Sequence, residues 1–234
     1  MPKIKLKGKD MKMKKLILLT VFLLVAMAGS SVMADVGSAF GTQATAQSIG
    51  QRVGYFGLGV GVADFTSVVG TFDYGLSKYT TGRLKLGFTD DGDNTDMALA
   101  LGAEVRWQLW QAGGVNNRPV DLAIGPMIEY FKFSWDVGTA NADLSVFQFG
   151  GFVMGSHGFV TSGGNVVTPY AKLNVRLEDT KVSITGFPDA SESDLRVGLG
   201  TGVAYQLTNT MNLYGEFQFD GNNGFFAGVD FKVM

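Results

Sequence analysis

The chain contains no cysteine, a single histidine and only five prolines in 234 residues. Without cysteine it forms no disulfide, no thiolate metal site and no lipidated cysteine of the lipoprotein type. The sequence also lacks any cluster of metal ligands around His157, so neither a metal site nor a cofactor is predicted. Glycine is abundant instead, because 33 glycines are about twice the usual share of roughly 7%.

Basic residues are concentrated at the N-terminus. Seven lysines precede a 13-residue apolar run from Leu16 to Ala28, and Val32 and Ala34 suit a small-residue cleavage site. The run is short for a transmembrane helix, which needs about 20 residues. Residues 1–34 are therefore predicted to be a signal peptide cleaved near Ala34, with an uncleaved anchor as the alternative.

Removing this segment changes the charge of the protein. The whole chain has 19 basic and 21 acidic residues, of which seven and one lie in residues 1–34, so the mature chain has a net charge of −8. Such a protein is a poor candidate for binding nucleic acid. Its length and its 46% hydrophobic content fit one all-β domain.

The stretch 194–207, DLRVGLGTGVAYQL, alternates with a period of two. Its odd positions are mostly apolar from Leu195 to Leu207, whereas its even positions carry Arg196 and several glycines. On a water-exposed face, glycine contributes no side-chain contacts, but inside a narrow closed barrel it makes room for a neighbour's long side chain. The apolar face is therefore interpreted as lipid-facing, over a length sufficient for the roughly 9–11 residues of a spanning strand.

The same alternation recurs along the chain and predicts ten strands. Eight is the alternative, because short connections among the first three could merge two strands. An even number places both termini on the periplasmic side. The predicted strands are 53–64, 67–78, 83–89, 97–110, 120–134, 144–155, 166–178, 194–207, 211–219 and 224–233.

The last strand alternates Phe225 and Phe231 with Asp230 and Lys232. With the signal peptide and the alternating strands, this aromatic C-terminal strand resembles the bacterial outer-membrane β-barrel family, the small barrels of the OmpA, OmpX and OmpW kind. The chain departs from the family by adding Met234 after the last apolar-phase residue. The resemblance implies a transmembrane antiparallel up-and-down β-barrel in the bacterial outer membrane. It also implies the barrel-assembly machinery and lipopolysaccharide as partners.

The remaining segments are assigned from their composition. Residues 35–52 are small and polar and are predicted to be a periplasmic N-terminal lead-in, with a short strand or helix as the alternative. The barrel domain is then 53–234. Three polar, acidic connections, 90–96, 136–143 and 179–193, fall on one side and are predicted to be extracellular loops. The segments 111–118 and 156–165 are longer than expected for periplasmic turns.

Charged side chains gather on the inward faces of the predicted strands. Buried charges are costly unless they are paired, so they predict a web of ion pairs. This web either closes the lumen or lines a narrow path for water or ions. The predicted lumen-lining residues are Glu104, Arg106, Glu129, Lys172, Arg176, Glu178, Arg196 and Glu216.

No enzyme is predicted. Ser156 and His157 are adjacent, and adjacent strand residues point to opposite faces, which disfavours a nucleophile–base pair. The sequence DDGDNTD at 90–96 lacks the glycine and distal glutamate of a calcium loop. The predicted function is a non-enzymatic structural or narrow-pore surface protein. The alternatives are an adhesin acting through its outer loops, 181–193 above all, and a soluble secreted β-barrel binding protein.

Overall fold

The computed structural model describes residues 38–63, 66–90, 96–113, 117–137, 140–221 and 223–234. The predicted signal peptide lies outside these residues, so its cleavage near Ala34 stays a prediction. In the part of the chain that is described, no helix is long and apolar enough to span a membrane.

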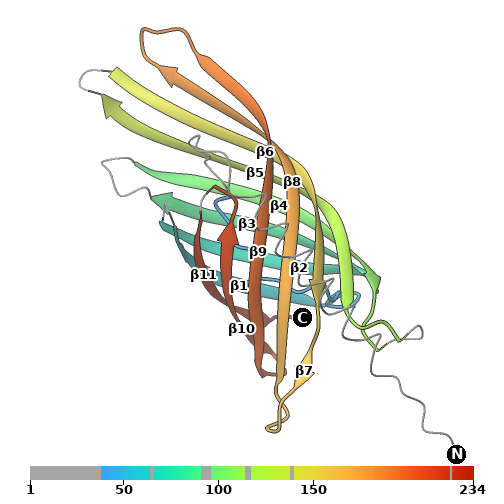
Figure 1. The fold of residues 1–234 in the computed structure, drawn as a ribbon. Helices are drawn as coiled ribbons and strands as arrows, with labels where there is room; N and C mark the ends of the chain where they lie inside the picture. Colours follow the sequence, from blue (N-terminus) through green and yellow to red (C-terminus); the bar gives the residue numbers. More distant parts are fainter. Residues whose placement is uncertain (1–37, 64–65, 91–95, 114–116, 138–139, 222) are drawn as a thin grey trace, which may run out of the picture. The chain divides into compact units, whose positions relative to one another are not determined.

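Ten long strands and one two-residue strand make up the fold (Figure 1). The strands are β1 (Gly54–Val62), β2 (Thr66–Ser77), β3 (Thr80–Asp90), β4 (Asp96–Trp110), β5 (Asp121–Val137), β6 (Ala140–Ser156), β7 (Phe159–Val160), β8 (Val166–Ile184), β9 (Ala190–Thr208), β10 (Met211–Phe219) and β11 (Gly224–Lys232).

The long strands close into an antiparallel ring. Strands that follow one another in sequence pair with each other, β6 pairs with β8, and β1 closes the ring against β11. The short β7 pairs with the start of β8. This arrangement confirms the up-and-down barrel with ten long strands, and the eight-strand alternative is wrong. Closure leaves no free sheet edge among the ten strands, which is the condition for a sheet to exist in lipid.

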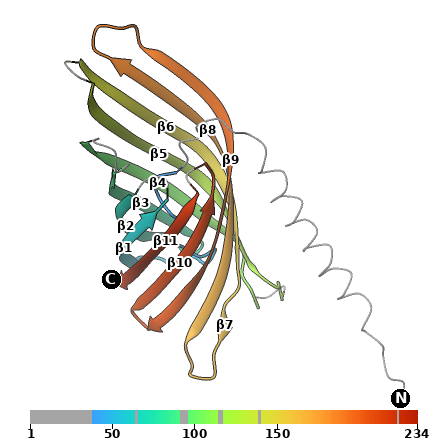
Figure 2. The same ribbon diagram turned by 60° about the vertical axis from the view of Figure 1, so that its left-hand side comes forward.

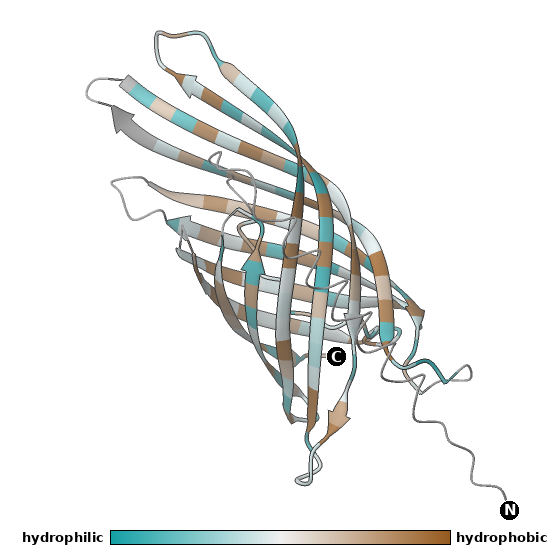
Figure 3. Ribbon diagram, viewed as in Figure 1, coloured by the Kyte–Doolittle hydropathy of each residue, from teal (hydrophilic) through white to brown (hydrophobic). Residues whose placement is uncertain are grey.

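Side chains alternate between the two faces of the wall as the sequence predicts. On β9, Leu195 and Val197 are exposed, whereas Gly198 and Gly200 are buried. Large apolar side chains cover the outside of the other strands in the same way, and Figure 3 shows the resulting alternation of brown and teal along each strand. The exterior is thus apolar and the interior is polar, which is the pattern of a membrane barrel.

Six strands are longer than predicted, namely β3, β4, β5, β6, β8 and β9. β5 and β6 have 17 residues each, and β8 and β9 have 19 each, whereas β1, β10 and β11 have nine. The expected loop 179–193 is therefore mostly a hairpin, which projects beyond the shorter strands in Figure 2. Most of its side chains are polar and exposed, with Val182 and Ile184 half-buried, so no continuous amphipathic alternation indicated strands there. An ion pair of 2.6 Å joins Lys181 on β8 to Asp189 in the turn just before β9.

The two long turns at the opposite end have local structure of their own. Phe159 and Val160 pair with Val167 and Val166 and form a small hairpin after β6. An isolated bridge joins Ala112 to Arg118 in the turn between β4 and β5. Local pairing therefore explains why these turns are longer than the two-residue turn between β2 and β3.

Candidate functional site

An N-terminal segment, residues 38–50, runs inside the barrel and is called the plug here. Ser38, Ala39, Phe40, Thr42 and Ala46 are all buried. The structure therefore corrects the expected periplasmic lead-in, residues 35–52, because residues 38–50 lie in the lumen, whereas Gln51 and Arg52 are exposed. The alternative of a short strand or helix is also not found in residues 38–52, which have neither.

Two charged side chains hold the plug by its backbone. Glu216 on β10 accepts hydrogen bonds from the backbone N–H groups of Thr42 at 2.8 Å and Gln43 at 3.1 Å. Arg83 on β3 donates to the carbonyl oxygens of the same two residues, at 2.5 and 3.0 Å. Hydrogen bonds with a charged partner are the strong ones. Because both side chains contact backbone atoms, they fix the path of the plug.

Further hydrogen bonds hold the plug at both ends. Ser38 donates from its hydroxyl to Glu129 at 2.6 Å and from its backbone N–H to Asp220 at 3.3 Å. Toward the other end, the backbone N–H of Ala46 donates to the Ser156 hydroxyl at 3.0 Å. The plug is therefore tied to strands on several sides of the ring.

Apolar side chains of the plug also pack against the inner wall of the barrel. Phe40 joins a buried cluster with Val69, Phe131 and Val146. Ala44 and Ala46 join a second cluster that includes Met127, Phe152 and Met154. Burying apolar surface contributes roughly 25 cal/mol per Å², so both clusters favour the docked plug.

Glycines in the wall make room for the plug. A Cβ at Gly75 would lie 1.6 Å from the carbonyl oxygen of Gly50, where the plug leaves the lumen. A Cβ at Gly59 would lie 2.2 Å from the side chain of Gln43, and one at Gly200 would lie 3.0 Å from Thr42 Oγ1. The glycine-rich inner faces thus accommodate the plug as well as side chains of neighbouring strands.

A chain of buried ion pairs crosses the lumen beside the plug. Glu104 lies 2.8 Å from Lys172 and 3.4 Å from Lys85, and Lys85 lies 3.1 Å from Glu129. These four side chains are at most 4% exposed. Charges buried to this degree are stable only when they are paired. The alternation of sign therefore explains how the lumen tolerates them.

A second cluster surrounds Arg176. Its guanidinium lies 3.3 Å from Asp220, donates to Asn174 at 2.9 Å and lies 3.7 Å from Glu178. Asp220 belongs to the turn between β10 and β11. Burial raises the pKa of Asp220 to about 7, because the loss of hydration outweighs the attraction of Arg176. The turn thus carries a group that titrates near neutral pH.

The structure places the predicted lumen-lining residues as follows. All eight belong to strands and lie on the interior face of the ring. Arg196 is half-buried, near Asp194 and Glu178, and the other seven are buried, namely Glu104, Arg106, Glu129, Lys172, Arg176, Glu178 and Glu216. Not all of these residues form the predicted ion pairs. Glu216 has no ion pair within the described residues and contacts the plug and Tyr170 instead.

Sequence reasoning missed the plug. The available signal was the composition of residues 38–48, which are all uncharged and, apart from Phe40, Gln43 and Gln47, small. A second signal was the run of inward glycines on β9, Gly198, Gly200 and Gly202, which leaves space in the lumen. Neither signal specifies that the segment folds back into the barrel.

His157 lies outside the interior network. It follows β6, and its ring packs against that of Phe159 with centroids 4.5 Å apart. The adjacent Ser156 is buried and holds the backbone of Ala46. No group of His, Asp or Glu that could hold a metal ion occurs among the described residues.

Comparisons with known proteins add the following. No protein-family model and no curated protein matches the sequence. Among solved structures, the chain is similar to the N-terminal β-barrel domain of Pseudomonas aeruginosa OprF, with 12% identity, 78% of this chain and 98% of that chain covered, and a TM-score of 0.37.

Two further solved structures are similar at the same level. The outer membrane protease OmpT from Escherichia coli is 9% identical, with coverages of 78% and 94% and a TM-score of 0.46. The KdgM porin is 8% identical, with coverages of 77% and 99% and a TM-score of 0.43. The closed ten-strand ring, its apolar outside and its charged inside give the chain the fold of an outer-membrane β-barrel.

Proposed function

We propose that the protein is a non-enzymatic outer-membrane barrel closed at rest by its own N-terminal plug. The observation that carries the proposal is the double contact of Thr42 and Gln43 with Glu216 and Arg83. An open pore would leave this part of the lumen to water. In this protein the plug occupies that part of the lumen, so ions pass only when the plug moves out of the lumen.

The apolar exterior supports a membrane location over the soluble secreted alternative. Exposed side chains such as Leu84, Met97 and Leu195 are more than 60% accessible, and a soluble barrel would not present so many. The signal peptide directs the chain out of the cytoplasm, and the outer membrane of a Gram-negative cell is the membrane that receives such barrels. Barrel-assembly machinery and lipopolysaccharide are then its partners during and after insertion.

The proposed orientation follows from the connections. The two-residue turns after β2 and β9, the start of β1 and the end of β11 lie at one end, which we assign to the periplasm. The long hairpins β5–β6 and β8–β9 project from the other end and are assigned to the cell exterior.

The test is single-channel conductance of the purified mature barrel in planar bilayers. The wild-type protein is expected to conduct little, whereas deletion of residues 38–49 is expected to raise conductance because it empties the lumen. Deletion of the distant turn 185–189 is the control and should leave conductance at the wild-type level. Equal conductance of the wild type and the plug deletion would contradict the proposal.

A surface adhesin is the second candidate. It is favoured by the β8–β9 hairpin, whose turn carries Phe187 with 70% of its surface exposed. Apolar side chains at the tip of a projecting hairpin are suited to contact a partner. Replacing Phe187 with Ser should abolish attachment of expressing cells without changing the heat-shifted gel band of the folded barrel, if this function applies. Unchanged attachment would exclude the hairpin as the binding element.

A further inference from the structure

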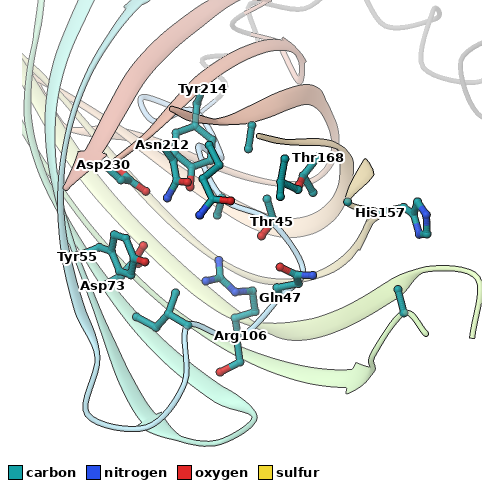
Figure 4. Close-up of a pocket in the computed structure, with 18 of the residues that line it drawn as sticks. Thr45, Gln47, Tyr55, Asp73, Arg106, His157, Thr168, Asn212, Tyr214 and Asp230 are labelled. Carbon is teal, nitrogen blue, oxygen red and sulfur yellow. The ribbon is translucent and has the colours of Figure 1, made fainter. Parts of the chain in front are cut away.

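A polar cavity of about 570 Å³ lies at the end of the barrel that carries the short turns (Figure 4). Its wall comes from the ends of strands β1 to β4 and β8 to β11 and from the segments that follow β4 and β6, and the plug lines one side through Thr45 and Gln47. The volume falls within the roughly 300–1,000 Å³ of ligand pockets. The cavity is therefore large enough for a small molecule.

Arg106 is the unusual group in this cavity. It is 3% exposed, yet Nε and Nη1 of its guanidinium have no hydrogen-bond partner within the described residues. Its side chain points into the cavity (Figure 4). Nearby Lys85 and Arg83, by contrast, are both paired with carboxylates. Glu104 and Asp230 attract Arg106 electrostatically, but a buried donor without an acceptor is costly, and such local violations concentrate at functional sites.

The opposite wall holds an acid that is also incompletely satisfied. Asp73 is held by Arg83, but Oδ1 of Asp230 is buried and has no hydrogen-bond partner within the described residues. The cavity therefore presents one cation with two unused N–H donors and one carboxylate with an oxygen that accepts no hydrogen bond within the described residues. A ligand with a second negative charge would be repelled by Asp230, whereas a hydrogen-bond donor would satisfy it.

We propose that this cavity binds a small hydroxy- or amino-carboxylate, with the carboxylate at Arg106 and the hydroxyl or ammonium group facing Asp230. The planar guanidinium matches the geometry of a carboxylate. The ligand supplies the partners that the folded chain leaves missing at both groups. The site is independent of whether the barrel conducts.

Isothermal titration of the folded, detergent-solubilised mature protein tests the proposal, with lactate, alanine, propionate and methyl lactate as probes. Lactate and alanine should bind, propionate should bind more weakly because it lacks the donor, and methyl lactate should bind least because it lacks the charge. Arg106→Gln should weaken lactate binding by about tenfold or more, as expected for loss of a charge-assisted hydrogen bond. Asp230→Ala, which removes the acceptor, should abolish the preference for lactate over propionate.

The controls separate a binding role from a structural one. Arg196→Gln changes a half-buried arginine that does not line the cavity and should leave lactate binding unchanged. Arg106→Gln should still give a heat-shifted gel band, since Nε and Nη1 of Arg106 donate no hydrogen bond within the described residues. Should that variant fail to fold, Arg106→Lys keeps the charge without the planar fork and should bind lactate more weakly. Absence of lactate and alanine binding to the wild type, or undiminished binding to a folded Arg106→Gln, would overturn the proposal.

Discussion

The backbone N–H of Thr42 donates a 2.8 Å hydrogen bond to Oε1 of Glu216, although the two residues are 174 positions apart in the chain. This contact joins the N-terminal plug to β10, near the end of the sequence. Within the plug, Glu216 contacts backbone N–H groups rather than side chains, so this contact depends on the path of the plug and not on its sequence.

Replacing Glu216 with Ala should release the plug. The substitution leaves the N–H groups of Thr42 and Gln43 without their acceptor, and a hydrogen bond to a charged group contributes about 1.5–3 kcal/mol. The fraction of time spent in a conducting state should therefore rise by about tenfold or more, as measured in planar bilayers. Glu192→Ala on the exposed part of β9 is the control. A Glu216→Ala variant that stays closed would show that other contacts suffice to hold the plug.

Gly75→Ala should disturb the point where the plug leaves the lumen. The added Cβ would lie 1.6 Å from the Gly50 carbonyl oxygen, so the backbone must move and the 2.8 Å bond from Arg52 N to Gly75 O weakens. Overpacking of this kind costs about 1–3 kcal/mol. The urea midpoint should fall accordingly. Gly70→Ala on the same strand, whose Cβ would meet Leu86 O at 3.7 Å, should be nearly neutral. Equal midpoints for the two variants would argue against the close approach.

The buried ion pairs should contribute far more to the unfolding free energy than the exposed ones. Glu104→Gln removes the carboxylate between Lys85 and Lys172 and should destabilise the barrel by about 3–5 kcal/mol. Lys132→Ala removes an exposed pair with Asp143 and should cost at most about 1 kcal/mol. Urea unfolding of both variants in the same detergent provides the comparison. Similar losses of stability would mean that the lumen is more hydrated than the structure implies.

Asp220 should make stability depend on pH. Its pKa is raised by burial to about 7 in the folded protein and is about 3.9 in an unfolded chain, so the folded state binds the proton more tightly. Its contribution is complete below about pH 4 and is lost as pH rises toward 7. Over this pH range the unfolding free energy of the wild type should fall relative to that of Asp220→Asn. A difference that stays constant with pH would contradict the raised pKa.

The wall of the barrel follows from the sequence because lipid and lumen impose opposite requirements on alternate residues. Leu195 and Arg196 are neighbours in the chain, and only one register places the first outside and the second inside. Beyond the membrane both faces of a hairpin meet water. The pairing of Lys181 with Asp189 therefore had no periodic signal, and the strands there extend further than predicted.

The lumen was only partly predictable. Inward charges such as Glu104 and Lys172 follow from the strand period, and the structure places them inside. Their partners depend on which strands face each other across the ring, and this is a property of the closed barrel. The plug is harder still to predict, because Thr42 and Gln43 are held through backbone atoms that every residue type possesses.

The most direct test of the plug is a disulfide between Thr42→Cys and Gly200→Cys. The native chain has no cysteine, and a Cβ at position 200 would lie 3.0 Å from Thr42 Oγ1, so the two sulfurs can meet. Mild oxidation of the double variant in outer membranes should remove both thiols from reaction with a maleimide polymer and lock the barrel closed in bilayers, whereas each single variant should keep its thiol. Two free thiols in the oxidised double variant would show that residue 42 does not lie in the lumen.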